Sequence, residues 1–343
     1  MLKSAIHSIE RAQWERETRR RTHPFAWGLE HIGGPAAHDG DARAFLRRYA
    51  DQALADSDAF FSTGPAESYD FDGHRLVFPS AVQSPFAENN SVFGRWFPAR
   101  SSQNGSGHRG PAVVVLPQWN AQPESHVNIC RVLAFFGISA LRLSLPYHDE
   151  RKPDGIERAD YLVGPDIGLT LQANRQAILD VRRAVRWLEQ QGFDRIGIVG
   201  TSIGSAVGFI ALCHEPALRA AAFLHVSTYF ADVVHSGMTT SHVWAGLEGQ
   251  VTLDELRHYW APISPFPYVA RLKGAGKKIL MVSARYDLSF PYELSQQLWQ
   301  TLDLRGIEHE RLILPCGHYT LGRVPFSWLA GLRFIPFLLR SLR

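Results

Sequence analysis

The chain has 343 residues, of which 45% are hydrophobic and 20% charged, and its formal net charge is +3. So small a positive excess argues against a nucleic-acid-binding protein, which usually carries a strong basic stripe. The hydrophobic content is enough for one large domain with a buried core, with or without an insertion.

Neither the cysteines nor the apolar runs point to secretion or to a membrane. Cys130, Cys213 and Cys316 are too few and too scattered for a disulfide framework or a metal site, and they indicate free thiols in a reducing compartment. The N-terminus has no apolar stretch long enough for a signal peptide, and no window approaches the roughly 18 apolar residues of a membrane span. We therefore expect a cytoplasmic protein without stable membrane insertion.

The first 60 residues are charged and helical in pattern, and they predict an N-terminal helical extension ahead of one domain at 61–343. The aromatic residues Trp14, Phe25 and Trp27 of this segment fit two interpretations. They form either a clamp across the domain or a contact in a homodimer.

Two strand-like runs precede a Gly-, Ser- and Asn-rich joint at 101–110, and strands alternate with helices after it. The strand-like runs lie at 74–82, 91–99, 112–116, 138–145, 194–199, 220–226, 278–283 and 310–314. Several of the later runs are continuously apolar, as in strands buried on both faces. The best helical pattern lies at 171–189, where apolar residues recur at three- and four-residue spacing. This alternation predicts an α/β fold with a mostly parallel central sheet flanked by helices.

Two segments near the end of the chain depart from this alternation. Residues 227–276 are too long for an ordinary loop and contain a helical pattern at 253–259. They are either a helical lid over the carboxyl edge of the sheet or a peripheral helical excursion. The apolar segment 324–342 predicts the last helix of the fold, interrupted at Pro336 and packed on the sheet, with contact to a membrane surface as the alternative.

The sharpest motif is Gly200-Thr201-Ser202-Ile203-Gly204, a Gly-x-Ser-x-Gly pattern. It directly follows an apolar strand and opens a segment of small residues that can form a helix. The motif works at such a sharp strand-to-helix turn, because the turn lifts a strained serine clear of the sheet edge. The glycines are needed because a side chain at either position would collide with the neighbouring strand or helix. Ser202 is therefore a candidate nucleophile.

A serine hydroxyl needs a base, and the base needs an acid that orients it. Asp287 and His318 each follow a predicted strand, beyond the carboxyl ends where parallel sheets bind ligands. They complete the chain order Ser, Asp, His. Two rival acids are Asp232, just past the sixth strand, and Glu293, which suits the first turn of a helix.

From about residue 112 to its end, the chain resembles the α/β-hydrolase superfamily, and the two runs before the joint resemble the first two, antiparallel strands of that fold. The resemblance implies that Ser202 is the nucleophile, that His318 is the general base and acid, and that Asp287 orients His318. It implies neither a cofactor nor a metal.

The oxyanion of such a reaction needs two preorganised N–H donors. One is the backbone N–H of Ile203, and the other comes from the turn after the strand at 112–116. Many relatives carry a His-Gly pair there, whereas this chain has Pro117-Gln118-Trp119-Asn120. Pro117 has no N–H, so the Trp119 amide is the expected donor, with Gln118 second. The Trp119 side chain either lines the pocket or belongs to the core.

Other polar residues near the predicted edge of the sheet have weaker claims to a role. His126 and His148 could touch substrate, although a surface or helix-start role is favoured for each. The run 147–151 is an unlikely metal site, since adjacent side chains in a turn point apart and no metal-ligand spacing occurs. Cys316 is expected to be a small buried hydrophobe.

These residues together predict an acyl hydrolase that forms an acyl-enzyme and cleaves carboxylic esters of small molecules. An amidase, peptidase, thioesterase or acyltransferase would use the same residues. A serine rather than an aspartate at the turn argues against a dehalogenase or an epoxide hydrolase. The competing class is a non-catalytic binding protein of the same fold.

Overall fold

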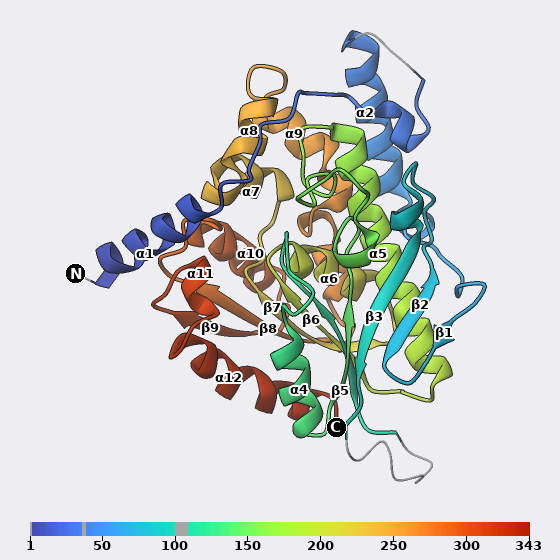
Figure 1. The fold of residues 1–343 in the computed structure, drawn as a ribbon, viewed down its shortest axis with the longest axis vertical. Coiled ribbons are helices and arrows are strands. Elements are labelled where there is room, and N and C mark those ends of the chain that lie inside the picture. The colour runs from blue at the N-terminus through green and yellow to red at the C-terminus, as the bar shows by residue number, and fades with distance from the viewer. Residues whose placement is uncertain (1, 36–38, 100–108) are drawn as a thin grey trace.

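The computed structural model describes residues 2–35, 39–99 and 109–343, and this part of the chain is built around a nine-stranded sheet (Figure 1). In spatial order the strands are β1 (Asp70–Phe71), β2 (Arg75–Pro79), β3 (Ser91–Phe97), β5 (Ser139–Leu143), β4 (Ala112–Leu116), β6 (Ile196–Thr201), β7 (Leu218–Leu224), β8 (Lys278–Ala284) and β9 (Glu310–Leu314). Strands β4 to β9 run parallel to one another, whereas β1, β2 and β3 pair antiparallel at one edge. The predicted α/β fold with a mostly parallel sheet is confirmed.

Helices cover both faces of the sheet. One face carries α5 (Ile167–Gln190), α6 (Ile203–His214) and α10 (Tyr292–Leu304), and the other carries α4 (Val127–Phe135), α11 (His318–Leu321) and α12 (Phe326–Ser341). Side chains alternate between the faces along each strand. On β4, Val114 therefore packs into the first layer, while Val113 and Val115 pack into the second. Burial on both faces explains the continuous apolar runs of the sequence.

The register of the central strands fixes where the serine motif lies. Gly200 on β6 is level with Leu116, the last residue of β4, and with Phe223 near the end of β7. The chain then turns into α6 at Ser202. The motif therefore stands at the carboxyl edge of the sheet, between the ends of its two neighbouring strands.

The segment between β7 and β8 contains α7 (Phe230–Ser236), α8 (Ser241–Leu247) and α9 (Leu253–Tyr259). A capping box between Thr252 and Glu255 begins α9, which coincides with the helical pattern predicted at 253–259. In Figure 1 these three helices lie on the same side of the molecule as the carboxyl ends of the central strands. This arrangement supports the interpretation of the segment as a lid, which stays a proposal.

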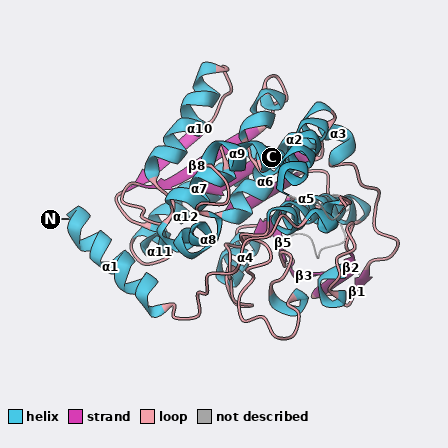
Figure 2. Cartoon of the chain, turned by 90° about the horizontal axis from the view of Figure 1, so that it is seen from above, coloured by secondary structure: helices cyan, strands magenta, loops and turns pink. Residues whose placement is uncertain are grey.

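The N-terminal residues form α1 (Leu2–Arg16), α2 (Asp39–Ala55) and α3 (Ser57–Phe60). Helix α2 packs on the insertion, where Arg43 contacts Glu255 of α9. Helix α1 lies beside α11 at the other side of the molecule (Figures 1 and 2). The N-terminal segment therefore contacts the rest of the same chain at two distant places. A clamp across the domain is one of the two interpretations of Trp14, Phe25 and Trp27.

The last helix and the joint at 101–110 need separate mention. Helix α12 is one helix that continues through Pro336, so the expected interruption is wrong. An interior proline removes one backbone donor and crowds the carbonyl of the preceding turn. Phe334, Phe337 and Leu338 around it are buried against the sheet, and this packing holds the helix together. Most of the predicted joint at 101–110 lies outside the described residues.

Across the residues that the structure describes, we find no helix with both the length and the apolar character needed to cross a bilayer.

Candidate active site

Ser202 occupies a strained backbone position between β6 and α6. Its φ of 55° and ψ of −119° place a non-glycine residue in a sparsely populated region, at a cost of roughly 1–3 kcal/mol. A Cβ at Gly200 would lie 2.4 Å from the carbonyl oxygen of Gly204. A Cβ at Gly204 would lie 2.6 Å from the carbonyl oxygens of Leu116 and Pro117. Only glycine fits at either position, as the motif predicts.

The backbone around Ser202 is fixed by the neighbouring strand. The Ser202 N–H donates to the carbonyl oxygen of Leu224 at 2.8 Å, and the Ser205 hydroxyl donates to the same oxygen at 2.8 Å. Ile203 is the first residue of α6, so its N–H is one of those that a helix leaves without an internal partner. Among the described residues no hydrogen bond occupies the N–H of Ile203, which is the position proposed for an oxyanion donor.

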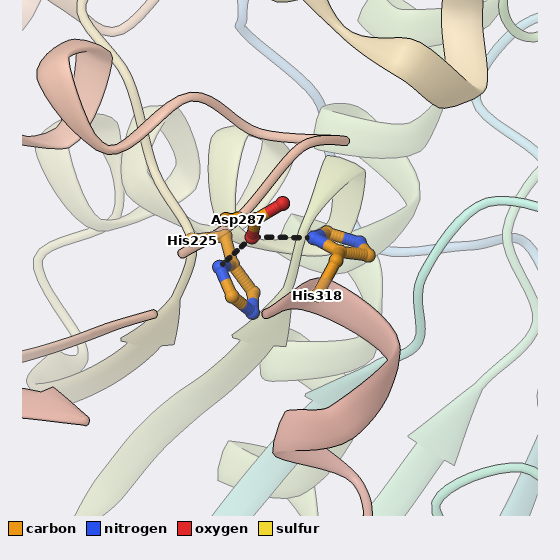
Figure 3. Close-up of side chains that lie close together, drawn as sticks. All are labelled: His225, Asp287 and His318. Atoms are coloured by element: carbon orange, nitrogen blue, oxygen red, sulfur yellow. Dashed lines mark hydrogen bonds and ion pairs between the residues drawn. The ribbon is translucent and has the colours of Figure 1, made fainter. Parts of the chain in front are cut away.

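His318 and Asp287 come together from two loops at the same edge of the sheet. His318 begins α11, and its Nδ1 donates to Asp287 Oδ2 at 2.9 Å (Figure 3). The other oxygen of Asp287 accepts from the N–H groups of Ser289 at 2.8 Å and Phe290 at 2.7 Å. These two bonds hold the carboxylate in place, so that it orients the imidazole of His318.

A second histidine, which the sequence analysis missed, binds the same carboxylate oxygen. His225 Nδ1 lies 2.9 Å from Asp287 Oδ2, and the two imidazole rings are 4.4 Å apart (Figure 3). His225 directly follows β7 with a φ of 60°. The strand predicted at 220–226 included this residue, which concealed a histidine just past a strand end.

Burial and charge set the protonation of these three groups. For Asp287, burial opposes ionisation, but the two histidines outweigh it and hold its pKa well below the usual range. For His318, burial opposes the charged form, but the charge and hydrogen bond of Asp287 outweigh it and raise the pKa above 6.5. Burial, followed by the charge of His318, lowers the pKa of His225. The site thus pairs an ionised acid with one basic and one neutral histidine.

Ser202 and His318 line one cavity of about 1190 Å³. Among the residues that the structure describes, no hydrogen bond joins the Ser202 hydroxyl to the imidazole of His318. Such bonds are often long in unliganded sites and close only when substrate binds. The structure therefore brings the two residues to one cavity without a hydrogen bond between them.

The N-terminal extension contacts the residues that directly follow His318. Glu10 of α1 is fully buried, and its carboxylate accepts from the N–H groups of Tyr319 and Thr320, both at 3.0 Å, and from the Thr320 hydroxyl at 3.0 Å. Glu17 accepts from the Tyr319 hydroxyl at 3.2 Å. Both carboxylates also help to raise the pKa of His318. No local pattern could have revealed this contact, because 309 residues separate Glu10 from Tyr319.

The turn after β4 carries the second set of expected donors. Gln118 and Trp119 both line the cavity, together with Ile203. The turn is pinned by His148, whose Nε2 accepts from the Asn120 N–H at 2.8 Å, while its Nδ1 donates to the carbonyl oxygen of Pro146 at 2.9 Å. His148 thus has a structural role. The assignment of Ile203, Trp119 and Gln118 to an oxyanion hole remains a proposal.

His126 stands at the start of α4, as favoured from the sequence, and also lines the cavity. Its Nε2 lies 2.8 Å from the Thr201 hydroxyl oxygen, and its buried Nδ1 has no partner among the described residues. Burial, followed by the charge of Arg142, lowers its pKa to about 4. His126 is therefore neutral beside the nucleophile.

The rival acids are engaged elsewhere. Asp232 on α7 is buried, and its carboxylate pairs with the Arg257 guanidinium at 2.6 Å. Glu293 lies in the first turn of α10, as expected. Cys316 is buried, and burial raises the pKa of its thiol to about 12. In the part of the chain that the structure describes, no hydrogen bond or ion pair joins any of the three to His318.

One cluster of the described residues has the composition of a metal site. The ligand atoms of His225, Asp287 and His318 lie within 4.8 Å of one another. Both Nδ1 atoms, however, are at hydrogen-bonding distance from Asp287 Oδ2. An ion would require both of these nitrogens to be deprotonated, whereas two N–H donors account fully for the observed contacts.

Comparisons with known proteins concern the family and the fold. Residues 169–322 match the family model described as the prolyl oligopeptidase family. The acylaminoacyl peptidase of Pyrococcus horikoshii is similar in structure, with a TM-score of 0.57 at 14% identity over 82% of this chain and 50% of that one. This chain thus spans about half the length of that peptidase. No curated protein sequence matches the chain.

Two esterases are similar over nearly their whole length. Acetyl xylan esterase 1 from Thermoanaerobacterium sp. JW/SL YS485 has a TM-score of 0.60 at 13% identity, over 85% of this chain and 93% of that one. The acetyl xylan esterase from Paenibacillus sp. R4 has a TM-score of 0.61 at 15% identity, over 85% of this chain and 98% of that one. At such identities the likeness concerns the fold.

The sheet order, the strained serine and these likenesses define the fold, which is that of the α/β hydrolases. The family match at 169–322 spans Ser202, Asp287 and His318, so this part of the chain is similar to the prolyl oligopeptidase family. Both peptidases and esterases occur among the similar structures.

Proposed function

We propose that the protein hydrolyses carboxylic esters through an acyl-enzyme formed on Ser202. The observation that carries the proposal is the pairing of His318 with a fixed carboxylate in the cavity that also holds the strained serine. This is the arrangement that a serine nucleophile requires, because the base must be held in one tautomer. With Nδ1 donating to Asp287, the Nε2 of His318 is free to accept a proton.

The first half of the reaction forms the acyl-enzyme. His318 Nε2 takes the proton from Ser202 as the hydroxyl oxygen attacks the ester carbonyl, and the backbone N–H groups of Ile203 and Trp119 stabilise the oxyanion. As the intermediate collapses, the carbon–oxygen bond to the alcohol breaks, and His318 returns the proton to the leaving alcohol. Asp287 stabilises the imidazolium that exists between these two steps.

The second half of the reaction releases the acid. His318 Nε2 deprotonates a water molecule, which attacks the acyl carbonyl, and the bond to Ser202 breaks with return of the proton to the serine oxygen. No group outside the protein and water is required for the proton transfers.

An ester substrate is favoured over a peptide by the extent of the structural likeness. This chain matches the acetyl xylan esterases over nearly their full length but covers about half of the acylaminoacyl peptidase. Alcohols also leave more easily than amines, so an ester demands less of the general acid. A peptidase acting with the same residues is the alternative.

A fluorophosphonate probe tests the nucleophile directly. We expect the wild-type protein to be labelled and Ser202→Ala not to be, with ester hydrolysis reduced by at least about 10⁴-fold. Ser241→Ala, at an exposed position of α8, is the matched control and should behave as wild type. Equal failure of wild type and Ser202→Ala to react would support a non-catalytic binding protein.

The choice between ester and peptide is tested with paired substrates. We expect p-nitrophenyl acetate to be hydrolysed with a much higher kcat/KM than the p-nitroanilide of an N-acetylated amino acid. The reverse order would identify a peptidase and overturn the ester assignment.

A further inference from the structure

The cavity at Ser202 continues along one face of the sheet into a groove between α4 and α12. The groove is lined on one side by Ile129, Val132 and Phe136, at and just after α4, and on the other by Trp328, Leu332 and Ile335 of α12. Figures 1 and 2 both place these two helices beside each other. The reacting centre and the groove are thus parts of one space.

The inner wall of this groove is apolar as well. Val199, Leu224 and Val282 line the cavity from the neighbouring strands β6, β7 and β8. All three pack on the face of the sheet that α4 and α12 cover. Val199 is three residues before Ser202, so the apolar wall starts directly beside the nucleophile.

Charged groups of the cavity come from other segments. Glu17, Glu124 and Arg158 line it from the position directly after α1, from the turn that precedes α4 and from the loop after β5. No charged side chain of α4 or α12 is among the described residues that line it. One region of the cavity therefore suits a polar group, and the groove suits a hydrocarbon.

The outer rim of the groove leaves large apolar side chains in contact with solvent. Trp328 is 68% exposed, Leu332 74%, Phe136 49% and Val132 42%. Scattered apolar residues on a surface are ordinary, but a cluster that borders a cavity indicates a binding site. A linear chain lying between the helices would cover these side chains.

We infer that the groove between α4 and α12 binds a long, unbranched acyl chain, so that the substrates are esters of fatty acids rather than of acetic acid. The inference rests on the proposed ester hydrolysis, because it assigns the acyl part of the same substrate. The carbonyl lies at Ser202, and the chain runs along Val199 and Val282 and out between the helices. Each methylene buried there raises the affinity by up to about fourfold, the equivalent of about 0.8 kcal/mol.

Gly331 of α12 offers a way to block the groove without disturbing the fold. It lines the cavity, and a Cβ at this position would meet no atom within 4 Å. Gly40 of α2 is a control, since it is also helical and open around its Cβ but does not line the cavity. Substituting Ala, Leu and Trp at 331 in turn increases the volume that obstructs the groove. If the Trp variant does not fold, the two smaller variants still test the inference.

The test compares kcat/KM for p-nitrophenyl laurate and p-nitrophenyl acetate. We expect the wild type to prefer laurate, and the ratio of laurate to acetate to fall progressively along the series at 331, by at least about tenfold for Gly331→Trp. Gly40→Trp should keep the wild-type ratio. A wild type that prefers acetate, or equal ratios in Gly331→Trp and Gly40→Trp, would overturn the inference and leave the proposed hydrolysis intact.

A binding measurement separates the groove from the chemistry. Ser202→Ala should bind the fluorescent fatty acid cis-parinaric acid, and the double variant Ser202→Ala/Gly331→Trp should bind it at least about tenfold more weakly. Binding that Gly331→Trp does not weaken contradicts the acyl groove. Binding as expected, without esterase activity or fluorophosphonate labelling of the wild type, supports the groove and rejects the proposed function.

Discussion

At Asp287, one carboxylate oxygen accepts hydrogen bonds from two imidazoles. The two histidines are not equivalent, because the pKa of His318 is raised and that of His225 is lowered. A neutral His225 can donate a hydrogen bond to this oxygen and so restrain Asp287. It is therefore a positioning residue, which restrains the carboxylate that orients the base.

Replacement of His225 by leucine tests this role through the pH profile. His318 must be neutral to accept the serine proton, so activity falls as the pH drops below its raised pKa, and the acid limb of the wild type lies above pH 6.5. Without the His225 hydrogen bond, Asp287 attracts the charged His318 more strongly. We expect the acid limb of His225→Leu to move to higher pH and kcat/KM at the optimum to fall about 10- to 100-fold, the effect of a hydrogen bond to a charged group.

The control for this variant is His74→Leu at an exposed position on the edge of the sheet, which should leave the profile unchanged. A purely structural role would lower stability without moving the acid limb. Loss of activity in the wild type on treatment with a chelator would instead favour a metal bound by His225, Asp287 and His318.

Among the helices, α1 acts on the site from outside the sheet. The N-terminal end of α11 has backbone N–H groups that need acceptors, and Glu10 supplies a carboxylate for two of them from a distant part of the chain. This buried carboxylate, bound by two backbone N–H groups and by the Thr320 hydroxyl, fixes the position of the helix that begins with His318. The N-terminal extension thus helps to position the segment that carries His318.

Glu10→Gln keeps the size of this side chain and removes its charge. We expect kcat to fall by about tenfold with little change in KM, because the base is displaced while the rest of the cavity is intact. The raised pKa of His318 should also fall, which moves the acid limb to lower pH, since Glu10 contributes to that rise. Glu15→Gln on the exposed face of α1 is the control, and equal kinetics of the two variants would show that α1 does not act on the site.

The secondary-structure elements were predictable where their signals are local. The strands at 112–116 and 310–314 and the helix at 253–259 have the predicted bounds, because strand-like runs and helical spacing are properties of neighbouring residues. Strand β1 was missed, since two residues cannot display an alternating pattern. The helix through Pro336 was also misjudged, because tertiary packing offsets the local preference.

Over the whole molecule, the site residues also divide into those that a local sequence signal marks and those that it does not. Ser202, Asp287 and His318 could be singled out because the motif and the ends of the strands mark them. His225 and Glu10 could not, because their roles depend on contacts between segments that the sequence does not show to be close. The groove between α4 and α12 belongs to this second group, since only the fold reveals that the two helices face one space.

The part of the cavity around Trp119 is also assembled from segments that are distant in the sequence. The indole Nε1 donates to the carbonyl oxygen of Ala159 at 2.9 Å, the ring stacks on His242 with centroids 5.7 Å apart, and the Arg158 guanidinium lies 4.9 Å from its centre. The turn that carries the expected oxyanion donors is therefore tied to the loop after β5 and to α8. Trp119 lines the pocket and packs against the core at once.

Trp119→Ala removes these ties and retains the backbone N–H. Because the side chain is only partly buried, we expect the free energy of unfolding to fall by about 2 kcal/mol, less than for a fully buried tryptophan, as measured by urea denaturation. Loosening of the turn misplaces the donor, so kcat/KM should fall about tenfold. Trp119→Phe keeps the ring and loses only the Nε1 hydrogen bond, so both quantities should lie between those of Trp119→Ala and the wild type. An alanine variant as stable and as active as the wild type would show that the turn holds its position without this side chain, and that the ends of the neighbouring strands alone fix the geometry of the oxyanion hole.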